Sequence, residues 1–378
     1  MTTLTSQLEL RNQKGTHTME HHLSFSCDYM EGAHPRILQR LIETNLVQTP
    51  GYGLDSYCTS AKEKIRSACQ APDADIFFLT GGTQTNATVI DAVLKGYQGV
   101  IAAETGHISV HEAGAIELGG HKVLTLPHQN GKISASQIRT LLETYENDAN
   151  HDHMVMPGMV YLSHPTEYGT LYSKKELTEI SSLCREYQIP LYVDGARLAY
   201  ALACPQNDLT LADLAALCDV FYIGGTKCGA LFGEAIVVPK PDFIPHFFTI
   251  IKQHGALFAK GRLLGIQFDT LFTDHLYETI GNSAIQAADQ IRQALIQNGY
   301  QLCFGSPTNQ IFCVMENAVM EQLAGQVEFG FWEAYDDSHT IIRFATSWAT
   351  SPEQVEMLCR LLAAQHADNG HGNVAHKL

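Results

Sequence analysis

The feature that most constrains the fold is a series of short apolar runs separated by helical patterns. The runs are rich in Val, Ile, Leu, Phe and Tyr, and they occupy residues 75–79, 99–103, 122–126, 159–163, 190–194, 220–224 and 234–239. The helical pattern that begins at Ser173 opens with the capping-box sequence Ser-Lys-Lys-Glu. Strands that alternate with helices form right-handed βαβ units and build a mostly parallel sheet with helices on both faces. We therefore predict a large α/β domain.

The pattern changes after this series. A long helical pattern over about 259–298 precedes short apolar runs at 300–304, 310–315, 326–332 and 341–346, with helical patterns near 317–324 and 352–364. This order predicts a smaller α+β domain. We divide the chain into an N-terminal arm and helix (1–48), a large domain (49–270), a small C-terminal domain (271–366) and a polar, disordered tail (367–378).

Composition narrows the class of protein. The chain has 378 residues, of which 45% are hydrophobic and 17% charged, as in ordinary globular proteins. A net charge of −16 without a basic cluster argues against nucleic-acid binding. No run is long enough to span a membrane, and the N-terminus lacks the apolar core of a signal peptide. The ten cysteines form no CxxC pair, so we expect reduced thiols, a cytoplasmic location and no metal site.

Three sequence features follow predicted strands, at the edge where open α/β sheets bind ligands. The sequence GGTQTN (81–86) opens a helix, where free N–H groups and the helix dipole attract an anion. Asp194 ends the run 190–194, and Thr226 and Lys227 follow the run 220–224. Each also has an ordinary explanation: glycine-rich turns are common, Asp194 can cap the next helix, and a loop lysine can reach solvent. The neighbours of Lys227, however, are small or apolar.

Together these features match the requirements of pyridoxal phosphate. This cofactor needs a lysine amine for a Schiff base, an acidic partner for its pyridine nitrogen, and a cradle for its phosphate. Lys227, Asp194 and residues 81–86 supply all three from strand ends. Burial in an apolar turn lowers the pKa of a lysine, which makes the free amine available as a nucleophile.

The chain resembles the L-threonine aldolase and β-eliminating lyase family of fold-type I pyridoxal-phosphate enzymes. The matching segments are TGGTQTN (80–86), ETGHISVHEAGA (104–115), YVDGARLAYA (192–201), GGTKCGALFG (224–233), KGRLLGIQ (260–267) and IIRFATSW (341–348). The resemblance implies a large domain with a mostly parallel seven-stranded sheet and a smaller α+β domain. It also implies a homodimer or homotetramer with shared active sites.

For the cofactor, the resemblance implies a role for each matching residue. Lys227 would form the Schiff base, Asp194 would pair with the pyridine nitrogen, and His107 would stack on the ring. The phosphate would be bound by Gly82 and Thr83, helped by Thr226, and by Arg262 from a neighbouring subunit. His107 could instead be an ordinary helix N-terminal residue, and Arg262 could lie on an exposed helix face.

For the substrate, the resemblance implies that Arg197 and Arg343 hold the α-carboxylate, since a guanidinium suits bidentate contact. Arg343 could also be an ordinary strand arginine. Near the N-terminus many members carry Ser-Asp, with the serine near the substrate carboxylate, whereas this chain has Cys27-Asp28. A cysteine is a poor hydrogen-bond partner for a carboxylate, so we expect another group in that role, and Asp28 is a candidate substrate contact.

A second departure bears on the reaction. Well-known threonine aldolases carry a histidine in the loop after the central strand, and here that loop, SHPTEYGT (163–170), places Glu167 at the position. A carboxylate can accept the proton of a β-hydroxyl group. His164 is a second candidate, although a structural histidine before Pro165 explains it equally well. The candidate catalytic residues are therefore Lys227, His107 and Glu167.

The expected function is that of a pyridoxal-phosphate-dependent lyase. Such an enzyme cleaves β-hydroxy-α-amino acids, such as threonine, allo-threonine or phenylserine, to glycine and an aldehyde. Two alternatives stay open: a β-eliminating lyase or aminotransferase for another amino acid, and a non-catalytic protein that binds the cofactor. Glu167 keeps the first alternative open, while the intact Lys227–Asp194 pair argues against the second.

Overall fold

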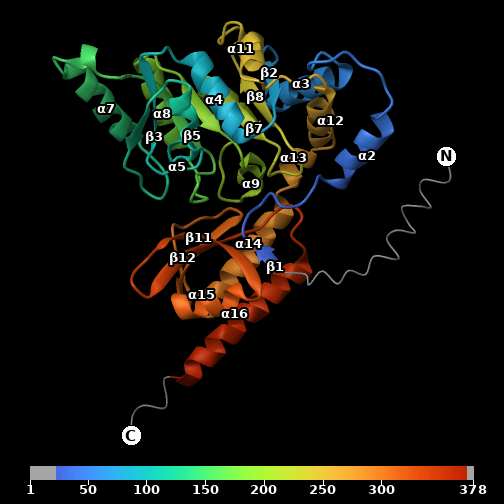
Figure 1. Ribbon diagram of the computed structural model, residues 1–378, viewed down its shortest axis with the longest axis vertical. Helices are drawn as coiled ribbons and strands as arrows, with labels where there is room; N and C mark the ends of the chain where they lie inside the picture. Colours follow the sequence, from blue (N-terminus) through green and yellow to red (C-terminus); the bar gives the residue numbers. More distant parts are fainter. Residues whose placement is uncertain (1–22, 373–378) are drawn as a thin grey trace.

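The chain folds into a large part and a small part that meet along one edge. The computed structural model describes residues 23–372. Figure 1 shows the large part, with its central sheet, above the small part, and helix α14 (Asn282–Gln297) extends from the boundary into the small part. The predicted arm (1–48) and tail (367–378) therefore lie partly outside the described residues.

The large part is built on a seven-stranded sheet. Its strands are β2 (Asp75–Leu79), β3 (Gln98–Ala103), β4 (Val123–Leu126), β5 (Met156–Ser163), β6 (Leu191–Asp194), β7 (Val220–Gly224) and β8 (Glu234–Val238). The spatial order is β2-β8-β7-β6-β5-β3-β4. Strand β8 pairs antiparallel with both of its neighbours, β2 and β7, and the other pairs in this sheet are parallel. All seven predicted strands and the mostly parallel sheet are confirmed.

Helices cover both faces of this sheet. They are α2 (Pro35–Thr44), α3 (Ser56–Ala68), α4 (Gly82–Val93), α5 (His107–Val110), α6 (Ala115–Leu118), α7 (Ala135–Asn147), α8 (Lys174–Glu186), α9 (Leu198–Ala203), α10 (Leu211–Leu217), α11 (Phe247–Gln253), α12 (Arg262–Leu271) and α13 (Leu276–Thr279), with a 3₁₀ turn at His151–His153. Alternate residues of β5 enter separate cores: Val160 and Leu162 on one face, Met159 and Tyr161 on the other. This alternation explains why the strands read as continuous apolar runs.

The capping box at the start of α8 is confirmed. The Ser173 side chain accepts the backbone N–H of Glu176 at 3.2 Å, and the Glu176 carboxylate accepts the backbone N–H of Ser173 at 2.8 Å. The two residues thus satisfy N–H groups that the first turn of a helix leaves without acceptors.

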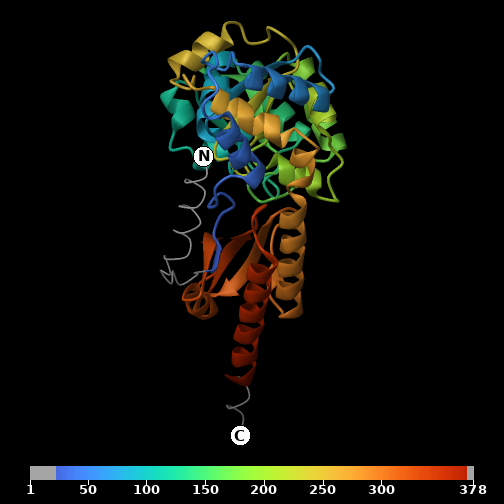
Figure 2. The same cartoon turned by 90° about the vertical axis from the view of Figure 1, so that its right-hand side faces the viewer.

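The small part contains a five-stranded sheet packed on two long helices. Its strands are β1 (Leu23–Phe25), β9 (Gln301–Leu302), β10 (Gln310–Glu316), β11 (Val327–Ala334) and β12 (His339–Ala345), and its helices are α14, α15 (Asn317–Ala324) and α16 (Pro352–Gly372). The order is β1-β11-β12-β10-β9, so β1 of the N-terminal arm joins this sheet, parallel to β11. Figure 2 shows α14 and α16 side by side. The domain boundary near residue 270 stays a prediction.

One sequence expectation is wrong in detail. The helical pattern over 259–298 forms three helices, α12, α13 and α14, rather than one. Asp274 and His275 between α12 and α13 have φ angles of 53° and 55°, and a right-handed helix cannot pass through left-handed residues. Helix α16 continues to Gly372, into the segment predicted as a tail. In residues 23–372, no helix combines the length and hydrophobicity needed to cross a bilayer.

Candidate active site

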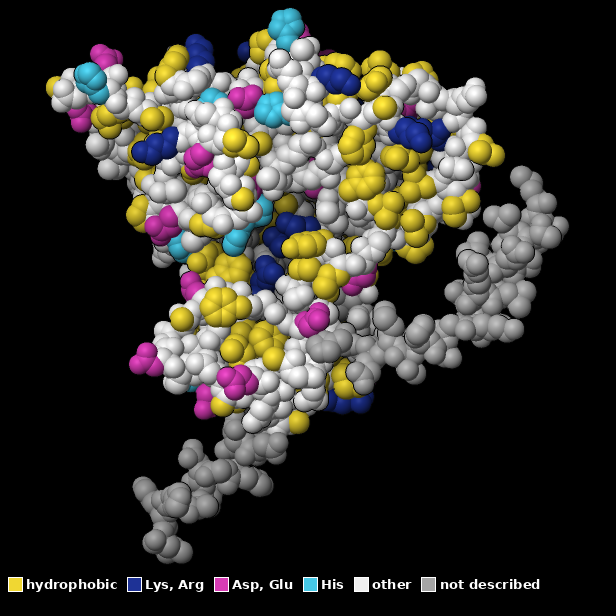
Figure 3. All heavy atoms as spheres, in the orientation of Figure 1, with side chains coloured by type: hydrophobic (Ala, Val, Ile, Leu, Met, Phe, Trp, Pro, Cys, Tyr) yellow, Lys and Arg dark blue, Asp and Glu magenta, His cyan; other side chains and the backbone are white. Residues whose placement is uncertain are grey.

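A cavity of about 590 Å³ lies where the carboxyl ends of the large-sheet strands face the small part. Its lining consists of Tyr29, Thr105, His107, Val110, His111, Glu167, Tyr168, Arg197, Lys227, Gln310, Phe331, Trp332, Glu333 and Arg343. Figure 3 shows Lys and Arg side chains gathered in a hollow at this boundary. Five of the predicted site residues therefore meet here. A larger cavity of about 1160 Å³, near His128 and Arg292, has none of them in its lining.

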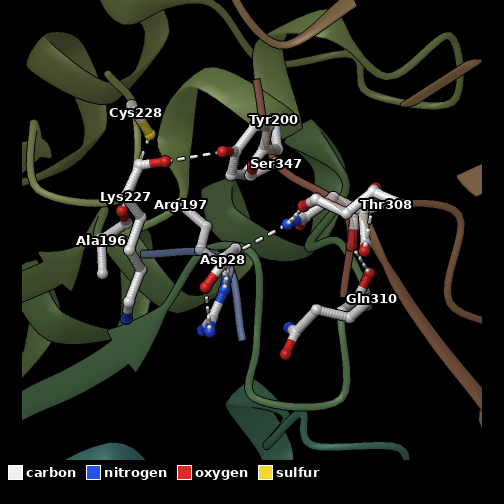
Figure 4. A network of polar contacts seen from close by, with 12 residues as sticks. Asp28, Ala196, Arg197, Tyr200, Lys227, Cys228, Thr308, Gln310 and Ser347 are labelled. Carbon is white, nitrogen blue, oxygen red and sulfur yellow. Dashed lines mark hydrogen bonds and ion pairs between the residues drawn. The ribbon is translucent and has the colours of Figure 1, made fainter. Parts of the chain in front are cut away.

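Lys227 lies in the tight turn between β7 and β8. The turn requires glycine, because a Cβ on Gly225 would lie 2.5 Å from the carbonyl oxygen of Gly233. The Tyr200 hydroxyl donates to the Lys227 carbonyl at 2.6 Å and fixes the backbone (Figure 4). Burial, followed by the nearby charge of Arg197, lowers the pKa of Lys227. Among the described residues the structure records no hydrogen bond or ion pair for Nζ, so the amine is available for chemistry.

Asp194 ends β6 and is buried. Its Oδ2 accepts the Tyr161 hydroxyl at 2.6 Å and the Asn86 amide at 3.0 Å, and its Oδ1 accepts the backbone N–H of Ala196 at 2.9 Å. Burial alone would raise the pKa of this carboxyl group, but the charge of His107 and these donors bring it below its ordinary value. Asp194 is therefore a buried carboxylate suited to hold a protonated ring nitrogen.

His107 begins α5, at the carboxyl end of β3. Its backbone N–H donates to Glu167 Oε1 at 2.8 Å, and its Nδ1 lies 2.7 Å from Glu112 Oε1. Because a carboxylate only accepts hydrogen bonds, Nδ1 carries the proton in this pair. The His111 ring lies 5.7 Å away, centroid to centroid.

Glu167 lies in the loop after β5 and is buried at the cavity wall. Its Oε1 also accepts the Ser163 hydroxyl at 2.6 Å. Burial raises the pKa of Glu167 above its ordinary value, as suits a group that accepts a proton near neutral pH. The other candidate, His164, is absent from the cavity lining and contacts Asn207 at 3.3 Å. Burial lowers its pKa to about 4.

The start of α4 presents free backbone donors. The N-cap Gly81 has no side-chain cap, and among the described residues no acceptor is recorded for the N–H groups of Gly82, Thr83 and Gln84. A Cβ on Gly82 would lie 3.1 Å from the Tyr222 hydroxyl, so glycine leaves the backbone open at this point. Free N–H donors at the N-terminus of a helix fit a bound phosphate.

The two other predicted phosphate contacts have partners within the chain. The Thr226 hydroxyl donates to Glu234 at 2.8 Å and accepts the Gly233 N–H at 3.0 Å. The Arg262 guanidinium donates to the carbonyl oxygens of Thr44 and Val47. Arg262 lines a separate surface pocket instead of the cavity that Lys227 lines.

The two arginines at the cavity are held differently. Arg197 binds both oxygens of Asp28, at 2.7 and 3.0 Å, beside Lys227 (Figure 4). Burial alone would raise the pKa of Asp28, but the charges of Arg197 and Lys227, together with the hydrogen bonds from Arg197 and Asn309, lower it to about 2. Asp28 therefore neutralises Arg197, and it does not line the cavity. Arg343 donates to the Gln310 side chain at 3.1 Å and to the Ser26 carbonyl at 2.7 Å, while its buried Nε has no partner among the described residues.

Sequence reasoning missed three polar residues of the site, Glu112, Tyr161 and Gln310, and it placed Asn86 in the phosphate cradle, whereas Asn86 donates to Asp194. Asn86 and Glu112 stand inside the segments 80–86 and 104–115 that carry the resemblance, so those segments contained the signal. Tyr161 reads as one more core residue of a buried strand. Gln310 comes from β10 of the small part, and no pattern in the sequence indicates that it faces Glu167.

Comparisons with known proteins agree with this geometry. The sequence profile of the family described as "Beta-eliminating lyase" matches residues 32–328. The chain is 30% identical to the low specificity L-threonine aldolase of Pseudomonas aeruginosa, over 90% of this chain and 97% of that protein. A protein of the same name from Pseudomonas sp. is also 30% identical, over 88% of this chain and 95% of that protein.

Solved structures give the same result. The Leishmania major threonine aldolase superposes with a TM-score of 0.88 at 43% identity, covering 91% of this chain and 99% of that one. Histidinol-phosphate aminotransferase from Clostridium acetobutylicum, at 14% identity and a TM-score of 0.70 over 92% of this chain and 99% of that one, shares the fold alone. The architecture is that of fold-type I pyridoxal-phosphate enzymes, and the chain belongs to the beta-eliminating lyase family.

Proposed function

We propose that this protein holds pyridoxal 5′-phosphate at Lys227 and cleaves β-hydroxy-α-amino acids to glycine and an aldehyde. The observation that carries the proposal is the convergence of three groups: a buried lysine with no recorded hydrogen bond or ion pair in the described chain, the carboxylate Asp194, and the carboxylate Glu167 with a raised pKa. The relatives named L-threonine aldolase favour this reaction over β-elimination and transamination.

The residues at the strand ends fit the cofactor. When bound, pyridoxal phosphate supplies an electron sink for a bond broken at the substrate α-carbon. The amine of Lys227 would hold the cofactor at its aldehyde carbon, Asp194 would keep its ring nitrogen protonated, and His107 would contact its ring. The N–H groups of Gly82 and Thr83 would bind its phosphate.

The substrate is oriented by the arginines and deprotonated by Glu167. Arg343 and Arg197, which both line the cavity, bind the α-carboxylate, and this contact fixes the direction of the Cα–Cβ bond. Glu167 accepts the β-hydroxyl proton, because its raised pKa makes it a stronger base than an exposed glutamate. Asp28 acts through Arg197 and does not contact the substrate.

We further propose a homodimer or homotetramer in which Arg262 serves the site of a neighbouring subunit. Its guanidinium lies outside the cavity of its own chain and contacts the end of α2. Helix α2 and the following loop carry exposed apolar side chains: Leu38, Ile42, Leu46, Val47 and Leu54. Figure 3 shows apolar side chains gathered on this flank of the large part. Apolar patches of this kind are typical of subunit contacts. The ten free cysteines fit a reducing compartment, the cytoplasm.

A product assay tests the function. The purified protein is incubated with pyridoxal phosphate and a panel of threonine, allo-threonine and phenylserine, and glycine and aldehyde are measured separately. Equal amounts of both products are expected. Serine, cysteine and a keto-acid acceptor serve as controls for β-elimination and transamination. Release of pyruvate or transfer of the amino group without glycine would overturn the aldolase assignment.

A further inference from the structure

Glu112 is a buried carboxylate next to the proposed ring site that the mechanism above does not use. It lies five residues after His107, and its side chain is fully buried. One oxygen, Oε1, accepts two hydrogen bonds, from His107 Nδ1 at 2.7 Å and from the Asn86 amide at 2.6 Å. The other, Oε2, has no partner among the described residues. A fully buried carboxylate costs considerable desolvation free energy, so its two strong contacts call for a role.

Asn86 connects Glu112 to Asp194. The same amide nitrogen that donates to Glu112 also donates to Asp194 Oδ2 at 3.0 Å. The Asn86 carbonyl oxygen accepts the Tyr192 hydroxyl at 2.8 Å. Since both carboxylates can only accept, this network fixes which end of the amide faces them. One buried NH₂ group thus links the carboxylate at the ring nitrogen to the carboxylate that holds His107.

We infer that Glu112 and Asn86 are positioning residues that set His107 and Asp194 relative to one another. The inference rests on the proposed function, in which His107 contacts the face of the cofactor ring and Asp194 contacts its nitrogen. Both groups act on one rigid ring, so their separation and angle matter as much as their presence. Glu112 also fixes the protonated nitrogen of His107, as outer partners of functional histidines do.

A purely structural role makes a different prediction. If Glu112 only supports the local fold, its replacement weakens the site whatever residue stands at position 107. If Glu112 acts through His107, its replacement matters only while His107 is present. A double-mutant cycle separates these cases, because coupling appears only between residues that act together.

The experiment measures the dissociation constant of pyridoxal phosphate for the cofactor-free, full-length protein by equilibrium dialysis. Glu112→Gln is expected to weaken binding about 10–100-fold, the range seen when an outer partner of a bound group is removed. In a His107→Phe background, which keeps a ring, the same change is expected to alter binding less than about threefold. The matched control is Glu117→Gln, at an exposed glutamate of helix α6, five residues after Glu112. The affinity of this variant for pyridoxal phosphate is expected to equal that of the wild type.

Asn86→Asp tests the other half of the bridge at nearly constant shape. The change places a third carboxylate between Glu112 and Asp194, and like charges in a buried site repel. Binding is expected to weaken about 10–100-fold, in the His107→Phe background as well, because this effect passes through Asp194. Circular dichroism of each variant confirms that it folds.

Two results would overturn the inference. One is an equal effect of Glu112→Gln in both backgrounds, which marks Glu112 as fold support. The other is wild-type affinity in Asn86→Asp. If the protein binds the cofactor but releases no glycine, the proposed function is wrong. The double-mutant cycle still tests this inference in that case, because it measures only cofactor affinity. A wild-type protein that binds no cofactor overturns both.

Discussion

The two ends of the proposed cofactor site are organised in different ways. At the ring end, Asp194 and His107 are joined by a continuous set of buried hydrogen bonds through Asn86 and Glu112. At the phosphate end, the first N–H groups of α4 have no recorded acceptor among the described residues. The Thr226 hydroxyl there donates to a glutamate.

The ring end is organised by contacts within one chain, whereas the phosphate end is expected to be completed by the cofactor and by a second subunit. The ring end is preorganised, because hydrogen bonds through Asn86 and Glu112 hold Asp194 and His107 in place before any cofactor arrives. The phosphate end presents N–H donors that suit an anion, and Arg262, to which the family resemblance gives a phosphate contact, lies outside the cavity of its own chain. Changes at the ring end should therefore act within one subunit, and changes at the phosphate end should depend on assembly.

The largest effect is expected for Lys227→Ala at the ring end. Removal of the amine abolishes the covalent link, and turnover is expected to fall more than about a thousandfold, as for other covalent nucleophiles. Absorbance of the bound chromophore and its trapping by borohydride check the link. Lys175→Ala, at a side chain that is 87% exposed, is the control. Borohydride trapping on another lysine in the Lys227 variant would contradict the assignment.

Asp194→Asn is expected to rank second. Asparagine keeps the shape but removes the charge that holds the ring nitrogen protonated, so the electron sink weakens. We expect kcat to fall roughly 100–1000-fold, the range for loss of one preorganised electrostatic contact. Steady-state kinetics measure this effect, with Asp152→Asn at a 94% exposed side chain as the control. A variant with unchanged kcat would remove Asp194 from the mechanism.

Glu167→Gln is expected to change both rate and pH dependence. A base works when ionised, and burial raises the pKa of Glu167 above its ordinary value of 4.5. The kcat/KM of the wild type should therefore rise with pH through a window above that value. In the variant, this rise of kcat/KM on the acid side of the pH profile should disappear, and the rate should fall about 100-fold. The pH profile of glycine release measures both, and an unchanged acid limb in the variant assigns the base elsewhere.

The same raised pKa has a consequence for stability. A carboxyl group whose pKa is higher in the folded state contributes stability below its unfolded pKa and loses it as pH rises through the folded pKa. The unfolding free energy of the wild type should therefore fall relative to that of Glu167→Gln as pH rises. Urea unfolding of the cofactor-free proteins at acid and neutral pH measures the difference. A constant difference would show that Glu167 titrates alike in both states.

The sequence indicates the residues at the strand ends of the site but not the side chains that connect them, for a physical reason. Lys227 and Asp194 follow directly from their strands, and the carboxyl ends of parallel strands meet at one edge of a sheet. Asn86 and Glu112 depend on how a helix and a loop pack, which no local pattern specifies. The end of the helix at Asp274 and His275 was missed because the amphipathic pattern of the sequence continues across these residues. Their left-handed φ angles, which end the helix, leave no mark in that pattern. The contact from Gln310 depends on how the two parts dock.

The smallest effect is expected for Arg262→Gln at the phosphate end. One cationic contact to a phosphate is removed while the α4 donors remain, so the affinity for pyridoxal phosphate should fall only about tenfold, the equivalent of roughly 1.4 kcal/mol. Equilibrium dialysis measures this change. The control is Arg360→Gln, an arginine whose side chain is 65% exposed on α16 of the small part.

Mixed oligomers then decide which chain Arg262 serves. Arg262→Gln subunits retain Lys227, and Lys227→Ala subunits retain Arg262. If Arg262 acts across the interface, a mixed oligomer contains one site with both residues intact, so at limiting cofactor its activity should exceed that of either parent. If Arg262 acts within its own chain, every site in the mixture lacks one of the two residues, and mixing restores nothing. Restored activity in the mixed oligomers would show that one chain forms the ring end of a site and a second chain completes its phosphate end. If mixing restores no activity, both ends lie within a single subunit.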